Sequence, residues 1–242
     1  SPTLDAAADS QRESQRDDAS MNPDDRPTIA SRRGTRIWDL PTRLFHWSLA
    51  ACVAGSIISI KAGSIDWHMR FGYAVLALVL FRLLWGFAGS RYALFSHFVR
   101  GPGDVLAYVG GRLKHAGGHN PLGALSVLAL LLLLLAQASG GLFANDGSFS
   151  EGPLAKLVSS SLSNRISTLH RWAEWAIYAL VLLHLAAVTF YSVFKSEPLV
   201  GAMLHGDRQL DVEPAQDDAR LRVRGLLLFL LAAALTWYVV TL

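Results

Sequence analysis

Residues 169–194 read LHRWAEWAIYALVLLHLAAVTFYSVF, a stretch long and apolar enough to cross a bilayer as one helix. Two histidines lie within it, His170 and His184. Fourteen positions at about 100° per residue bring both imidazoles to one face, roughly 21 Å apart along the helix axis. One histidine is therefore expected near each boundary of a hydrocarbon core about 30 Å thick. No single metal ion could be shared by both.

An imidazole inside lipid loses its water partners, so an intramembrane histidine is expected to have a functional partner. Two histidines at this spacing predict two stacked sites. Haem is the apolar redox group that accepts neutral imidazole from either side and buries its own large surface between helices. The plainer alternative is that each histidine only hydrogen-bonds a neighbouring helix.

The composition describes a polytopic all-α membrane protein. The chain has 242 residues, 52% of them hydrophobic and 17% charged, and the apolar residues are concentrated in blocks. The blocks that approach spanning length are residues 44–62, 69–89, 122–143, 169–194 and 225–242. We predict a four-helix transmembrane bundle that binds two haems, followed by a fifth C-terminal transmembrane helix.

Cysteine content and charge exclude several classes of protein. The one cysteine, Cys52, allows no disulfide framework, no thiolate zinc cluster and no C-x-x-C-H haem attachment. Any haem is therefore expected to be non-covalently held, of the b type. The net charge of +3 does not indicate nucleic-acid binding, because the arginines sort by membrane side instead of forming a groove.

The lysines and arginines predict the topology. The predicted inner side carries seven in the N-terminal segment, four between the second and third blocks and five between the fourth and fifth. The predicted outer side carries five. This positive-inside excess of sixteen against five places the N-terminus in the cytoplasm and the C-terminus outside.

The chain divides into three predicted parts. Residues 1–36 are polar and acidic, which predicts a disordered tail. Residues 37–207 form the membrane domain, and residues 208–242 form a linker with the C-terminal helix. Within the domain we expect a short interfacial helix over residues 103–113 and a solvated outer loop over residues 144–168.

Topology then matches the histidines in depth. His46 and His184 are predicted near the inner side, and His68 and His170 near the outer side. His46 would therefore face His184, and His68 would face His170. Ligation by two histidines fills both axial positions of a haem, which favours electron transfer over oxygen activation. Two such haems would carry electrons from one side of the bilayer to the other.

Other side chains could support these sites. Arg43 near the inner pair, and Arg70 and Arg171 near the outer pair, are candidates to neutralise haem propionates, although ordinary interfacial anchoring explains them as well. Gly72 follows His68 by one turn, and its missing Cβ would let a flat macrocycle approach the backbone. Close helix packing is the alternative for Gly72.

The remaining ionisable residues in or near the membrane have plainer interpretations. Arg82 in the second block is expected to snorkel to the membrane surface. The more specific alternative is that its guanidinium binds a haem propionate or a quinone. His97, His115 and His119 are interpreted as solvated loop residues, since their spacing supports no zinc site.

Five motifs occur in a specific order. They are WDLPTRLFHW around His46, DWHMRFGY around His68, FRLLWGFAGSRYALFSHFVRGP through the inner loop, NPLGALSVLALLLLLLAQASGGLFAND in the third block, and LHRWAEWAIYALVLLHLAAVTFY around His170 and His184. In this combination the chain resembles the bacterial cytochrome b561 family, which includes the b-type cytochrome subunits of nickel-iron hydrogenases. The resemblance covers residues 36–207.

The resemblance implies a four-helix, di-haem electron carrier of the bacterial inner membrane. Such a carrier exchanges electrons between the quinone pool and a redox partner, here expected at the periplasmic face, and similar proteins favour the inner end for quinone. It implies an electron-transfer subunit more than a self-contained enzyme. The polar tail and the fifth helix depart from the family and leave the partner open. The alternatives are a transporter or proton channel with a histidine relay, and a haem-free membrane anchor.

Overall fold

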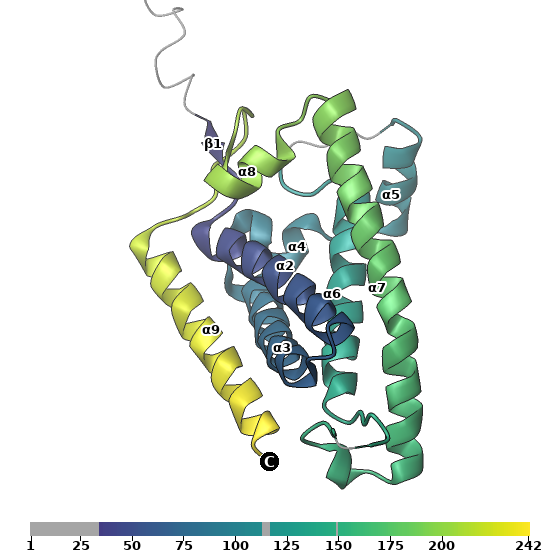
Figure 1. The fold of residues 1–242 in the computed structure, drawn as a ribbon. Helices are drawn as coiled ribbons and strands as arrows, with labels where there is room; N and C mark the ends of the chain where they lie inside the picture. Colours follow the sequence, from purple (N-terminus) through teal and green to yellow (C-terminus); the bar gives the residue numbers. More distant parts are fainter. Residues whose placement is uncertain (1–33, 113–116, 149) are drawn as a thin grey trace, which may run out of the picture. The chain divides into compact units, whose positions relative to one another are not determined.

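The computed structural model describes residues 34–112, 117–148 and 150–242. Five of its helices are long and apolar enough to cross a membrane (Figure 1). They are α2 (Leu40–Lys61), α3 (Ile65–Ala88), α6 (Pro121–Gly141), α7 (Ser160–Phe194) and α9 (Ala219–Val240). Each overlaps one predicted block, so the prediction of an all-α membrane protein with a fifth C-terminal helix is confirmed. The predicted N-terminal tail, as far as residue 33, lies outside the described residues.

Local side chains explain where these helices begin. Four of the five start at a residue whose side chain accepts a hydrogen bond from a backbone amide of the first turn: Asp39, Asn120, Ser159 and Asp218. Such an N-cap satisfies one of the amides that the first turn leaves without a helical partner. Pro41 and Pro121 occupy the first turns of α2 and α6, where a missing N–H removes no helical hydrogen bond.

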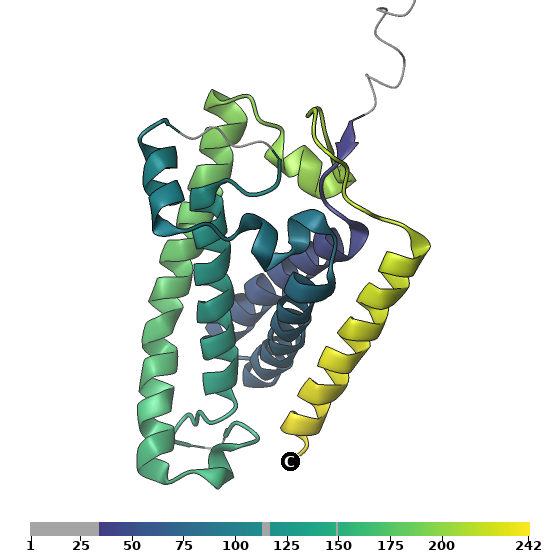
Figure 2. The ribbon, with the colours of Figure 1, turned by 180° about the vertical axis from the view of Figure 1, so that it is seen from behind.

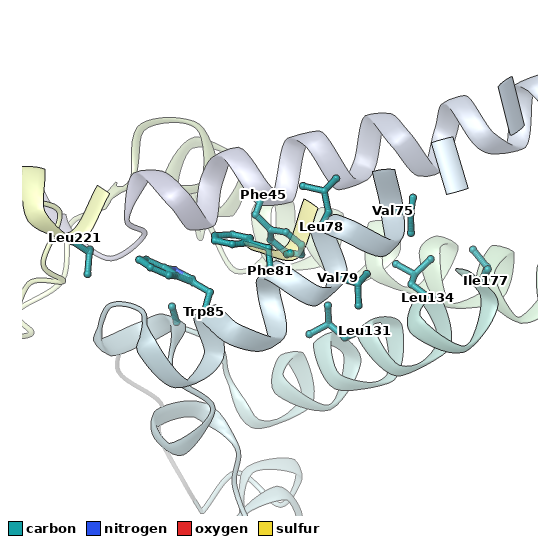
Figure 3. Packing of buried hydrophobic residues seen from close by; sticks show 12 residues of the cluster. Phe45, Val75, Leu78, Val79, Phe81, Trp85, Leu131, Leu134, Ile177 and Leu221 are labelled. Atoms are coloured by element: carbon teal, nitrogen blue, oxygen red, sulfur yellow. The ribbon is translucent and has the colours of Figure 1, made fainter. Parts of the chain in front are cut away.

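α3 is the central helix of the bundle. Half of its most apolar window is buried, against 17% or less in the other four long helices. It packs against α2, α6 and α9, and α6 in turn packs against α7. Figure 3 shows this core, in which Phe45 of α2 lies against Phe81 of α3 and Leu131 of α6 lies beside Val79 of α3. The fifth helix is therefore held to the bundle mainly through α3.

α7 is much longer than the apolar stretch that predicted it. Its 35 residues rise about 52 Å, well beyond a hydrocarbon core of about 30 Å. The predicted outer loop is wrong over residues 160–168, because these residues form the first turns of α7. Serines stabilise this polar start: Asn145 of the preceding loop donates to Ser163 Oγ at 2.6 Å and to Ser167 Oγ at 2.8 Å.

The bundle consists of two closely packed helix pairs, α2 with α3 and α6 with α7, joined between α3 and α6. The backbone of α7 makes no comparably extensive approach to α2 or α3. Side chains meet across this separation instead, as the Lys61 Nζ to Glu174 Oε1 distance of 2.7 Å shows. This arrangement leaves the backbone of α7 apart from those of α2 and α3.

Short elements cover the end of the bundle where α2 begins. They are η3 (Arg91–Ala93), α4 (Phe95–Phe98), α5 (Pro102–Val109), α8 (Leu199–His205), and the strands β1 (Thr35–Arg36) and β2 (Asp207–Arg208). A further turn, η4 (Ala155–Leu157), lies in the loop before α7. The expected interfacial helix is present as α5, although it ends at Val109. β1 and β2 pair antiparallel, so the chain returns after α7 to its own start.

The segment between α7 and α9 is fastened to the beginning of α2. The last carbonyls of α8 accept hydrogen bonds from three side chains: Arg36 at 2.9 Å, Arg43 at 2.7 Å and Trp47 at 3.2 Å. These carbonyls would otherwise lack helical partners. Asp217 then accepts from the Leu40 amide at 3.2 Å and from Arg222 Nε of α9 at 3.0 Å. We call these contacts around Asp217 and α8 the C-terminal clamp.

Candidate functional site

The structure brings the four predicted histidines together in two pairs. His46 of α2 lies opposite His184 of α7, with ring centroids 6.3 Å apart and ring planes at 49°. His68 of α3 lies opposite His170 of α7, with centroids 6.1 Å apart and planes at 90°. We call them the inner and the outer pair, after the sides that the sequence predicts. The partners within each pair are those expected from depth.

The two pairs lie at separate levels of the bundle. His170 and His184 belong to the same helix and differ by fourteen positions, which corresponds to about 21 Å along the axis. His46 lies in the second turn of α2, near its start, and His68 lies in the first turn of α3. Since α2 and α3 are consecutive antiparallel helices, the two pairs are close to opposite ends of the bundle.

Backbone carbonyls orient both rings of the outer pair. His68 Nδ1 lies 2.9 Å from the Ser56 carbonyl oxygen of α2, and His170 Nδ1 lies 3.1 Å from the Gln137 carbonyl oxygen of α6. A carbonyl can only accept a hydrogen bond, so each Nδ1 carries its proton and each Nε2 keeps a free lone pair. Gln137 also donates its side-chain amide to the His170 carbonyl at 2.9 Å.

A glycine makes room for one of these rings. A Cβ added to Gly141 of α6 would lie 3.2 Å from Cε1 of His170. The neighbouring Gly140 has only ordinary contacts, the nearest at 3.7 Å. Gly141 therefore lets the His170 imidazole lie against the α6 backbone, within reach of the Gln137 carbonyl.

The inner pair lacks such orientation. His46 Nδ1 is buried and has no hydrogen-bond partner among the described residues. The His46 ring packs edge-on against Trp47, with centroids 5.1 Å apart. Within the same ranges, neither ring of the inner pair makes a hydrogen bond of the kind seen in the outer pair.

The spacing within each pair fits an ion held between two imidazoles. Two opposed imidazoles that each give one nitrogen to a metal at about 2 Å have ring centroids roughly 6.3 Å apart. The observed 6.3 Å and 6.1 Å match this value. Across the described ranges, no three or more His, Cys, Asp or Glu side chains gather to hold a metal. Each pair therefore supplies two ligands, as haem requires, and not the four of a structural zinc site.

The predicted supporting residues have varied surroundings. A Cβ at Gly72 would meet nothing within 4 Å, so the space beside it is open. Arg43 is engaged in the C-terminal clamp, although its Nε is buried without a partner in the described part of the chain. The Arg70 guanidinium lies 5.1 Å from the Trp67 ring centroid, and Arg171 donates to Thr168 Oγ1 at 3.3 Å. Their role towards propionates stays a prediction.

Arg82 does not snorkel, so that expectation is wrong. It is only 3% exposed, and its guanidinium lies over the rings of Phe95 and Phe98 of α4, at 5.1 Å and 5.7 Å. The aromatic faces attract the cation and replace part of its hydration. The sequence signal was present in the FSHF that forms α4, but nothing in its spacing tied it to Arg82.

His97 and His119 are half-buried among aromatic rings at the inner end, so the interpretation of both as solvated loop residues is wrong. His97 lies against Tyr92, with ring centroids 5.1 Å apart. His119 lies between Trp38 and Phe98, at 4.7 Å and 4.9 Å. His115 lies outside the described residues.

Sequence reasoning missed a polar group beside the outer pair. Glu174 follows His170 by one turn, accepts from Lys61 at 2.7 Å and is hydrogen-bonded by the Tyr178 hydroxyl. An i, i+4, i+8 spacing of His170, Glu174 and Tyr178 on one helix was the signal that could have revealed it.

Comparison with known proteins identifies related sequences. A family model described as prokaryotic cytochrome b561 matches residues 37–206. A protein of Rhodobacter capsulatus described as "Probable Ni/Fe-hydrogenase B-type cytochrome subunit" is 22% identical, covering 76% of this chain and 85% of that protein. No solved structure matches the chain. The matched range contains all four paired histidines and ends before α9.

Proposed function

Because the chain belongs to the prokaryotic cytochrome b561 family and is a membrane-spanning b-type cytochrome of electron transfer, we propose that it holds two haems, one in each histidine pair. The inner haem would be ligated by His46 and His184, and the outer haem by His68 and His170. The main support is the pairing of all four histidines at two levels, each pair with the ring spacing that one iron requires.

Each residue of the pairs would perform a simple task. A bound haem supplies iron that changes its charge by one electron. The two imidazoles of a pair would hold the iron from opposite sides, which would favour electron transfer over oxygen activation. At the outer pair, the carbonyls of Ser56 and Gln137 hold the protons on Nδ1, so that each Nε2 would be available to hold the iron as a neutral ligand. A haem held by these residues would lie between α7 and the closely packed pair of α2 and α3.

We further propose that the protein relays electrons between membrane quinone and a redox protein at the periplasmic face. The printed name of the Rhodobacter capsulatus relative suggests a hydrogenase-like partner, and another cytochrome is the alternative. The excess of basic residues supports a bacterial inner-membrane location with the N-terminus in the cytoplasm. In this orientation α7 extends its polar first turns into the periplasm, beside the outer pair.

The test of the haem sites is spectroscopic. The full chain is purified from membranes, and haem per polypeptide is measured with a reduced-minus-oxidised difference spectrum. We expect two b haems in the wild type. His68→Ala and His170→Ala should each empty the same site, and His46→Ala and His184→Ala the other. His205→Ala, a histidine of α8 outside both pairs, is the matched control and should keep both haems.

Two results would contradict the proposal. The first is a wild-type protein that lacks b-type haem. The second is depletion of one common site by His68→Ala and His184→Ala while His170→Ala leaves it intact, since that outcome would break the pairing by depth.

A further inference from the structure

One edge of the helical bundle is closed by side chains instead of by helix packing. α2 packs against α3, α3 against α6, and α6 against α7, whereas the backbones of α7 and α2 approach each other much less closely. Figures 1 and 2 both show α7 running beside α6. We call the edge between α7 and α2 the seam. It is the loosely packed edge of the space in which a histidine pair would hold a haem.

An ion pair crosses the seam at its outer end. Nζ of Lys61, the last residue of α2, lies 2.7 Å from Glu174 Oε1 of α7. The Tyr178 hydroxyl, one turn further along α7, also donates to this carboxylate. Across residues 34–112, 117–148 and 150–242, no other ion pair joins α7 to α2 or α3. The charged contact that fastens α7 across the seam is therefore this pair.

The ion pair lies beside the outer histidine pair. Glu174 follows His170 by four positions, so both side chains project from the same face of α7, about 6 Å apart along the axis. On the other side of the seam, Lys61 ends α2 and His68 lies in the first turn of the next helix. The Glu174 carboxylate also interacts electrostatically with His68. The ion pair thus joins the same two groups of helices as the outer pair.

This contact is exposed enough to open. The side chains are 61% exposed at Lys61 and 26% at Glu174. Water and salt screen such a pair, so it can break while the helices stay folded. The opposite side of the outer site is closed by backbone packing, since α3 packs on α6 and Gly141 lets the His170 ring lie against α6. The seam is therefore the side of the outer site where a small movement would make an opening.

We propose that Lys61 and Glu174 form a latch over the route by which haem enters and leaves the outer site. With the ion pair open, α7 would move away from α2, and a flat macrocycle would pass between them to His68 and His170. With the ion pair closed, the seam is shut beside the site. This inference rests on the proposed outer haem and adds the side from which its site is filled.

The competing explanation is a contact that only holds the cofactor or stabilises the fold. A latch acts on the barrier between the free and the bound state, so its removal should speed entry and exit by similar factors and leave haem affinity nearly unchanged. A contact made only in the bound state would change the exit rate alone. A contact that only stabilises the fold would affect both haems.

The experiment measures haem exchange in the full chain in lipid nanodiscs. Exit is followed as transfer of haem to excess apomyoglobin. Entry is followed as the absorbance change when hemin is added to haem-free protein from cells that lack haem synthesis. The kinetic phase that persists in His46→Ala, which should hold only the outer haem, identifies the outer site.

Removal of either charge should speed exchange at the outer site. Lys61→Met and Glu174→Gln should each raise the exit and entry rates by about two- to fivefold, the range expected for an exposed ion pair. Lys61→Glu should raise both further, because two carboxylates repel, and its combination with Glu174→Lys should return the rates towards those of the wild type. Glu213→Gln removes the exposed ion pair with Arg91 and is the matched control, which should change neither rate.

Three results would overturn the latch while leaving the proposed function in place. They are unchanged exchange in both single variants, faster exit without faster entry, and equal acceleration at both haems. In each of them the wild type still holds its outer haem. A wild type whose outer pair binds no haem would contradict the proposed function itself, and the latch with it.

Discussion

The outer and inner histidine pairs have nearly the same spacing but different support. Both rings of the outer pair are held by helix carbonyls, and Gly141 admits one of them. In the inner pair, Nδ1 of His46 is buried without a partner among the described residues, and the helix that carries it is secured by the C-terminal clamp. The two proposed haem sites thus depend on different parts of the chain, which should allow them to be disturbed separately.

The largest expected effect concerns Gly141. Gly141→Val should displace the His170 ring, because even a Cβ at this position lies 3.2 Å from Cε1, and the outer haem should be lost in most molecules. Gly140→Ala is the matched control, since its Cβ would have only ordinary contacts. Haem content and the difference spectrum provide the measurement. Retention of both haems in Gly141→Val would show that the outer ring is not confined by α6.

The clamp should matter for the inner pair instead. Asp217→Asn removes the carboxylate that faces Arg36, Arg43 and Arg222, and should lower stability by about 2 kcal/mol. Because the clamp holds the start of α2, thermal release of the inner haem should begin at a lower temperature than in the wild type. Asp211→Asn, at an exposed position of the same segment, serves as the control. Equal loss of both haems would contradict a local role.

A smaller difference is expected in redox potential. A hydrogen bond from Nδ1–H to a carbonyl makes an imidazole a stronger donor and favours the ferric state. The outer haem should therefore have the lower potential, by about 20–60 mV for each such bond. Redox titration with optical detection measures both haems. Ser56→Ala keeps the carbonyl and removes only the hydroxyl, which also lies 3.0 Å from His68 Nδ1, so most of the difference should remain. A lower potential at the inner haem would reverse the comparison.

The smallest expected effect is a loss of thermal stability at acidic pH. Burial alone would raise the pKa of Asp217, but the hydrogen bonds from Arg222 and the Leu40 amide, with the charge of Arg36, hold it below its ordinary value of 3.8. The clamp should therefore stabilise fully above about pH 4 and weaken as the pH falls through the lower, folded pKa. Thermal unfolding measured against pH should show this step in the wild type and not in Asp217→Asn.

The sequence was sufficient for the bundle and for the histidine partners. Apolar blocks predicted five helices, and the sorting of basic residues assigned each histidine a depth, from which the pairing followed. The pairing of the histidines could be predicted without knowing any contact between helices. A spanning helix fixes the position of each of its residues along the membrane normal, so histidines at the same depth can be matched.

The supports of the sites could not be predicted in the same way. The acceptors at His68 and His170 are the main-chain carbonyls of Ser56 and Gln137. Every residue carries such a carbonyl, so the amino-acid sequence does not reveal which ones accept these hydrogen bonds. The clamp joins positions far apart in the sequence, such as Arg36 and Asp217, through side chains that look like ordinary surface charges. The depth of a residue in the membrane follows from the position of the apolar blocks in the sequence. The contacts described here depend instead on how each helix is rotated about its axis and on where the chain turns back.

The pairing of β1 with β2 has a consequence for biogenesis. The first membrane helix is fastened by residues that are synthesised only after four helices have entered the bilayer. His46, the proposed ligand that this helix carries, is therefore secured last, although it is made first. If each pair holds a haem as proposed, loading should follow the order of assembly, with the outer pair ready before the inner pair.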